Sequence, residues 1–131
     1  MSQPESVILV SGQETALLIS PDEEDHEILN AVFQHNSWTL HRAPSVNSLS
    51  ALVREKATSV VITERDLAVG DWKGVLEVIH HLPIAPLLIV ISRLADDHLW
   101  SEALNLGAYD VLAKPLDQIE ATRVLTSAWI R

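Results

Sequence analysis

The sequence contains no cysteine, few basic residues and no long apolar run. Without cysteine, the chain can form no disulfide, no cysteine-ligated zinc site and no thiol nucleophile. No apolar stretch approaches the roughly 18 residues that a membrane span needs. The first residues, MSQPES, lack the basic start of a secretory signal. Together these absences predict a cytoplasmic protein.

Basic residues are outnumbered two to one. The chain has 9 lysines and arginines against 18 aspartates and glutamates, which gives a formal net charge of −9. An acidic surface repels phosphate groups, so the composition argues against direct binding to nucleic acid and to anionic membranes.

Sequence patterns typical of enzymes are also missing. The chain has no Gly-rich nucleotide-binding motif and no serine–histidine–aspartate pattern, and its six histidines are scattered without metal-ligand spacing. We therefore expect a protein that is not an enzyme and that holds no cofactor.

What the sequence does contain is an alternation of short apolar runs with helical patterns. Residues 58–63 and 85–92 are nearly continuous apolar runs, as expected for strands buried on both faces of a sheet. The other segments follow the spacing of half-buried strands or amphipathic helices. The predicted strands are 16–20, 37–43, 58–63, 85–92 and 109–114, and the predicted helices are 21–35, 45–55, 72–82, 95–107 and 116–130.

Strands that alternate with helices form right-handed βαβ units and a parallel sheet covered on both faces. The predicted fold is therefore an α/β three-layer sandwich, a flavodoxin-like five-stranded parallel sheet of order 2-1-3-4-5. We assign one domain to residues 15–131 and an N-terminal extension to residues 1–14. In that extension, SVILV (6–10) is either an added edge strand or part of a dimer contact.

In such sheets, function is located where the strands end. The relevant residues are Ser20-Pro21-Asp22, Glu64, Ser92-Arg93 and Lys114-Pro115. Over roughly residues 15–130, this order and spacing resemble the receiver domains of response regulators in two-component signalling. Ser92 followed by ALNLGAYDVLAKP (103–115) matches the second half of that family's pattern.

The first half of the pattern departs from the family. The resemblance implies an acid pair after the first strand, where this chain has Ser20 and Pro21, and a phosphoacceptor aspartate where it has Glu64. Phosphoryl transfer to a carboxylate needs Mg²⁺ held by oxygen ligands. Pro21 supplies no side-chain oxygen, and Glu64 is longer than aspartate by one C–C bond, about 1.5 Å. We therefore predict a pseudo-receiver with no magnesium site.

Two local interpretations accompany this prediction. Ser20, Pro21 and Glu23 fit a capping box with Ser20 as the N-cap of the first helix. Glu64 is expected to pair with Lys114, because either charge alone in the pocket would be costly. The alternatives are that Glu64 is merely a solvated acid, or that Asp66 and Asp22 form a displaced acidic site with it that binds a divalent ion.

Aromatic residues suggest a further difference and a surface. In the family, an aromatic residue on the fifth strand moves together with the residue that corresponds to Ser92. In this chain Val111 occupies the position of that aromatic residue, and Tyr109 lies two residues earlier on the same strand face. Trp100 and Leu104 form an apolar line on the fourth helix and, with Trp129, are candidates for an interface. The competing interpretation places both indoles against the core.

The sequence thus predicts an atypical receiver domain that acts in signal transduction or transcriptional regulation through protein contacts, without phosphorylation. We expect a homodimer, with a histidine kinase or an output-domain protein as further partners. Two alternatives remain open: a phosphorylatable receiver that uses Asp66 with Mg²⁺, and a flavodoxin-like module that binds a small molecule in an apolar pocket at the strand ends.

Overall fold

The computed structural model describes residues 14–131. The SVILV segment at 6–10, predicted to be an edge strand or a dimer contact, lies outside these residues. The elements, in chain order, are β1 (Thr15–Ile19), α2 (Glu23–His35), β2 (Thr39–Arg42), a 3₁₀ turn η1 (Val46–Ser48), α3 (Leu49–Glu55), β3 (Val60–Glu64), α4 (Trp72–His80), β4 (Leu87–Ser92), α5 (Asp97–Leu106), β5 (Asp110–Ala113) and α6 (Gln118–Trp129).

The five strands form one parallel sheet of order β2-β1-β3-β4-β5. This confirms the predicted fold class. Leu17 of β1 is opposite Val61 of β3, and Val61 is opposite Leu88 of β4. This register places the carboxyl ends of β1, β3, β4 and β5 at one edge of the sheet.

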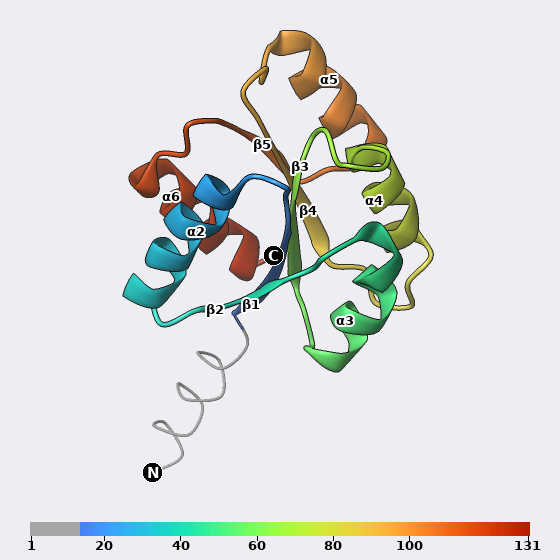
Figure 1. Cartoon of the computed structure of the whole chain (residues 1–131), viewed down its shortest axis with the longest axis horizontal. Coiled ribbons are helices and arrows are strands. Elements are labelled where there is room, and N and C mark those ends of the chain that lie inside the picture. The colour runs from blue at the N-terminus through green and yellow to red at the C-terminus, as the bar shows by residue number, and fades with distance from the viewer. Residues whose placement is uncertain (1–13) are drawn as a thin grey trace.

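Helices cover both faces of the sheet, with α2 and α6 on one side and α3, α4 and α5 on the other (Figure 1). Alternate strand residues supply the two cores. Leu18 and Ile62 pack with Phe33 of α2 on the first face, whereas Leu17 and Val61 pack on the second face with α3, α4 and α5. Across residues 14–131, no helix is both long and apolar enough to cross a membrane.

Four helices begin with an aspartate cap at the functional edge of the sheet. The carboxylates of Asp22, Asp71, Asp96 and Asp117 accept backbone N–H bonds from the first turns of α2, α4, α5 and α6. This satisfies donors that a helix start leaves unpaired.

The predicted cap of the first helix was wrong. Asp22, not Ser20, is the N-cap of α2: its Oδ1 accepts the Glu24 N–H at 3.0 Å. The Ser20 hydroxyl instead accepts the Asp22 N–H at 3.0 Å, two residues before the cap. The side chains of both residues can accept a backbone N–H, as an N-cap does. Because the cap is Asp22, Pro21 precedes the helix instead of occupying its first turn.

Candidate functional site

Lys114, next to the end of β5, is the centre of a buried charge cluster. Its Nζ donates to Glu64 Oε1 at 2.7 Å, to Asp25 Oδ2 at 2.8 Å and to Asp22 Oδ2 at 3.1 Å. The Lys114 side chain is only 3% exposed. An ammonium group has three N–H bonds, so all three are used by carboxylates.

Asp25 is brought to Lys114 by the way the chain leaves β1. Its carboxylate is almost fully buried in the first turn of α2 and also accepts the Ser20 hydroxyl at 2.7 Å. The neighbouring His26 is buried as well, and its Nε2 lies 2.9 Å from the carbonyl oxygen of Ser20. Ser20 thus fixes both the start of α2 and the orientation of Asp25.

Glu64 is the last residue of β3, and both of its carboxylate oxygens are engaged. Oε1 accepts from Lys114, and Oε2 accepts the backbone N–H of Asp66 at 3.2 Å. The structure therefore contains the ion pair expected between Glu64 and Lys114, and Glu64 is a buried residue rather than a solvated one.

Burial and hydrogen bonding act on Lys114 in opposite directions. Burial lowers the pKa of its amino group, but the hydrogen bonds to Asp25, Glu64 and Asp22 together outweigh burial and leave the pKa above its usual value. The hydrogen bond from Lys114, followed by that from the Glu24 N–H, holds the pKa of Asp22 below its usual value. Lys114 and Asp22 are therefore charged at neutral pH.

Arg93, just after β4, brings a second cation to the outer side of the cluster. Its Nη2 lies 3.5 Å from Asp22 Oδ2 and 3.4 Å from Glu24 Oε1. Asp22 is therefore shared between Lys114 and Arg93. This links the start of α2 to the β4–α5 loop across the edge of the sheet.

The absence of a magnesium site stays a prediction, which the position of Lys114 supports. Three carboxylates converge, but the point of convergence is occupied by the Lys114 ammonium. Within residues 14–131, no group of three or more histidine, aspartate or glutamate side chains is arranged to hold a metal ion. A Mg²⁺ ion placed among these oxygens would meet a like charge at the same position.

Asp66 lies apart from the other acids. Its side chain is 71% exposed and is 3.6 Å from the Arg65 Nε, and only its backbone N–H touches Glu64. Around Lys114 the structure brings Asp25, and not the Asp66 side chain, together with Glu64 and Asp22; the displaced site with Asp66 stays a prediction. Ser92 is buried, and its hydroxyl accepts the Leu94 N–H at 2.9 Å.

The predicted position of Tyr109 was also wrong. Tyr109 precedes β5 and turns toward α6, where its hydroxyl lies 2.6 Å from Ser127 Oγ. Val111 packs instead into the core beneath α3, α4 and α5. The two side chains therefore lie on opposite faces of the sheet.

The three candidate interface residues separate into two groups. Trp100 on α5 is 45% exposed, and Leu104 on the same helix is half-buried. Trp129 packs edge-on against Trp38 and Phe33, with ring centroids 5.4 and 6.1 Å apart, in the core under α2 and α6. Trp129 is half-buried and packs against this core, and its role in an interface stays a prediction.

Sequence reasoning missed Asp25, and it placed Arg93 at a strand end without giving it a role. Asp25 belongs to an acidic run at residues 22–25. Its one distinguishing signal is its position three residues after Asp22, because residues three apart lie on the same side of a helix.

Comparison with known proteins places this site in context. No protein-family model matches the chain. The transcriptional regulatory protein ZraR of Klebsiella oxytoca is 35% identical over 112 residues, which cover 82% of this chain and 25% of that protein. The chain thus spans about a quarter of the length of the curated relatives that it matches.

Solved structures share the fold over nearly the whole chain. A putative response regulator from Chloroflexus aurantiacus has a TM-score of 0.81 at 19% identity and covers 90% of this chain and 98% of its own. The signal receiver domain of an HD domain-containing protein from Pseudomonas fluorescens has a TM-score of 0.77 at 26% identity and covers 88% and 94%. The chain therefore has the fold of response-regulator receiver domains.

Proposed function

We propose that this chain is a receiver-type regulatory module that acts through protein contacts without being phosphorylated. The observation that supports this most directly is the occupation of Lys114 by the carboxylates of Glu64, Asp25 and Asp22.

Phosphoryl transfer makes demands that this arrangement opposes. The acceptor carboxylate needs a free oxygen, and Mg²⁺ must neutralise the incoming charge. Both oxygens of Glu64 already accept hydrogen bonds, and the Lys114 ammonium supplies the neutralising charge itself. Pro21 offers no oxygen ligand, and Asp25 is bound to Ser20 and Lys114.

The fixed cluster also indicates how the module is held. Lys114 connects β5 to β3 and to α2, and Arg93 adds the β4–α5 loop. The carboxylate of Glu64 supplies a permanent charge where a phosphorylated receiver has a transient one, although a phosphate carries nearer −1.5 to −2. We infer that no phosphate is added to Glu64, so the charge at this site does not change during signalling.

A signal must then pass through partners. Trp100 leaves a large aromatic surface exposed on α5, with Leu104 one turn further along. Exposed aromatic residues of this kind are typical anchors of protein interfaces. We propose a homodimer through this surface, with a histidine kinase or an output domain as further partners. The ZraR relatives, which are named as transcriptional regulators, suggest a role in transcription.

Intact-mass spectrometry after incubation with Mg²⁺ and acetyl phosphate tests the proposal. A receiver that keeps the acid pair and the phosphoacceptor aspartate serves as the positive control and gains the mass of one phosphoryl group. We expect this protein to gain none. The Glu64→Asp variant is also expected to gain none, because Pro21 and the bound Lys114 remain. A phosphoryl adduct on the unmodified protein would overturn the proposal.

A further inference from the structure

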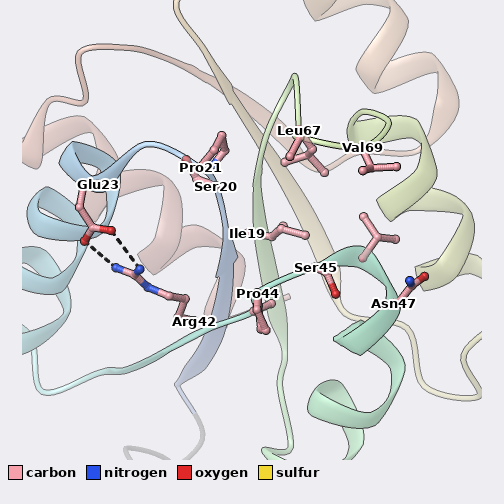
Figure 2. Close-up of a pocket in the computed structure, with 13 residues that line it drawn as sticks. Ile19, Ser20, Pro21, Glu23, Arg42, Pro44, Ser45, Asn47, Leu67 and Val69 are labelled. Atoms are coloured by element: carbon pink, nitrogen blue, oxygen red, sulfur yellow. Dashed lines mark hydrogen bonds and ion pairs between the residues drawn. The ribbon is translucent and has the colours of Figure 1, made fainter.

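A groove of about 490 Å³, with its lining residues drawn in Figure 2, opens beside Ser20 and Pro21 at the end of β1. Its floor is Ile19 at the end of β1. One side is the segment between β2 and α3, residues 43–47, and the opposite side is the β3–α4 turn, residues 67–69. The groove is thus next to the place where the strand order reverses between β1 and β3, which is where open α/β sheets bind ligands.

The turn that forms one wall is held in place by backbone hydrogen bonds. Leu67 N–H donates to the Gly70 carbonyl at 3.1 Å, and Trp72 N–H donates to the Arg65 carbonyl at 2.9 Å. Gly70 has a φ of 82°, a conformation that glycine adopts readily. The turn raises Val69, which is 84% exposed, beside the groove. The wall is therefore an ordered part of the fold.

The groove carries no unbalanced charge. Its charged lining residues are Glu23 and Arg42, which form a bidentate ion pair with oxygen–nitrogen distances of 2.7 and 3.0 Å (Figure 2). The rest of the lining is apolar or neutral, mainly aliphatic and proline side chains. Within residues 14–131, the side chains of Ser45 and Asn47 make no hydrogen bond, so they offer polar groups to a ligand.

We propose that this groove binds a small, uncharged, mostly apolar molecule that carries at least one hydrogen-bonding group. The volume falls within the roughly 300–1,000 Å³ typical of small-molecule sites, which are also mainly apolar with a few polar groups. An anion is disfavoured because Asp22 and Glu24 lie beside Glu23 and the chain carries a net charge of −9. A cation gains nothing from Glu23, which Arg42 already neutralises.

Such a ligand would touch the segments that hold the charge cluster. Ser20 lines the groove and also binds Asp25, and Leu67 follows Glu64 by three residues. A bound molecule would therefore act on both segments that contact Lys114, and it could serve as an input in place of a phosphate. The groove exists whether or not Glu64 accepts phosphate, so this inference does not depend on the proposed function.

Two dyes that differ by one charge test the inference. N-phenyl-1-naphthylamine is uncharged and apolar, has one N–H donor and fluoresces strongly in apolar surroundings; 8-anilinonaphthalene-1-sulfonate is its anionic counterpart. The purified protein is titrated with each dye. In the Ala68→Phe variant, a larger side chain fills the groove from an exposed position. Ala51→Phe adds the same bulk at an exposed position on α3 outside the groove.

We expect the neutral dye to bind the unmodified protein and the Ala51→Phe variant equally, at least tenfold more tightly than the sulfonate, and to lose at least tenfold in affinity with Ala68→Phe. The inference would be overturned if the neutral dye gave no fluorescence increase, or if it bound Ala68→Phe as tightly as the unmodified protein. Equal binding of both dyes would overturn the claim that the ligand is uncharged. Sedimentation without dye measures whether Ala68→Phe changes the oligomeric state. If Ala68→Phe dissociates a dimer, a second copy of the chain occupies the groove, and the small-molecule proposal is wrong.

Discussion

Replacing Lys114 with methionine should destabilise the protein far more than an ordinary surface substitution. Methionine keeps much of the side-chain bulk but removes the charge, so Glu64, Asp25 and Asp22 are left facing one another. Asp25 and Glu64 are the important pair, because their side chains are only 2% and 11% exposed. Asp22 is 31% exposed and keeps Arg93 as a partner.

Removing one partner of a buried ion pair typically costs about 3–5 kcal/mol, because the remaining charge is left uncompensated. Single domains have a free energy of unfolding of roughly 5–15 kcal/mol, so the variant should still fold. With a urea m-value of roughly 2 kcal/mol/M, this loss lowers the midpoint of unfolding by about 2 M.

Urea unfolding followed by tryptophan fluorescence measures this change. Lys73→Met is the matched control: Lys73 makes one ion pair with Glu102 at 2.8 Å, but its side chain is half exposed. Exposed pairs contribute little to stability, so this control should shift the midpoint only slightly. Equal midpoints for Lys114→Met and Lys73→Met at pH 7 would refute the reasoning.

Three further predictions concern the cluster and the exposed helix. Asp25→Asn should lower the free energy of unfolding by roughly 1.5–3 kcal/mol, the range for hydrogen bonds to a charged group; the neighbouring Glu24→Gln, at an exposed carboxylate, should change urea unfolding much less, and the reverse order would count against the cluster. Because the pKa of Lys114 is raised in the folded state, its contribution to stability should be complete below about pH 10.4 and be lost as the pH rises further, so the gap in midpoint between the unmodified protein and Lys114→Met should narrow in alkali. Trp100→Ala should weaken self-association in sedimentation velocity, whereas Leu106→Ala on the same helix should not; an unchanged monomer–dimer balance would remove Trp100 from the interface.

The fold could be predicted from the sequence because its main signals are local. The apolar runs of β3 and β4 indicate burial on both faces without reference to the rest of the chain. Gly107, expected to end the fourth helix, is its C-cap with a φ of 113°. The meeting of Glu64 and Lys114 also follows from topology, because both residues lie at the ends of parallel strands.

The remainder of the site depends on side-chain direction, which the sequence does not specify. Ser20 and Asp22 both have cap chemistry, and only the path of the backbone decides between them. Asp25 faces the sheet because of how α2 is rotated about its axis, and apart from its three-residue spacing from Asp22 nothing in the sequence distinguishes it from the exposed Glu24. Trp129 is similar: its position near the end of α6 did not reveal that it turns toward Trp38.

A crystal structure of the protein soaked in Mg²⁺ and beryllium fluoride tests the central claim most directly. Beryllium fluoride stands in for a phosphoryl group on a carboxylate, so it reports whether Glu64 can be freed from its hydrogen bonds. We expect Lys114 Nζ to remain within hydrogen-bonding distance of Glu64, Asp25 and Asp22, with no ordered metal or fluoride beside them. An ordered Mg²⁺ and beryllofluoride against Glu64, with Lys114 turned away from Asp25, would contradict the account.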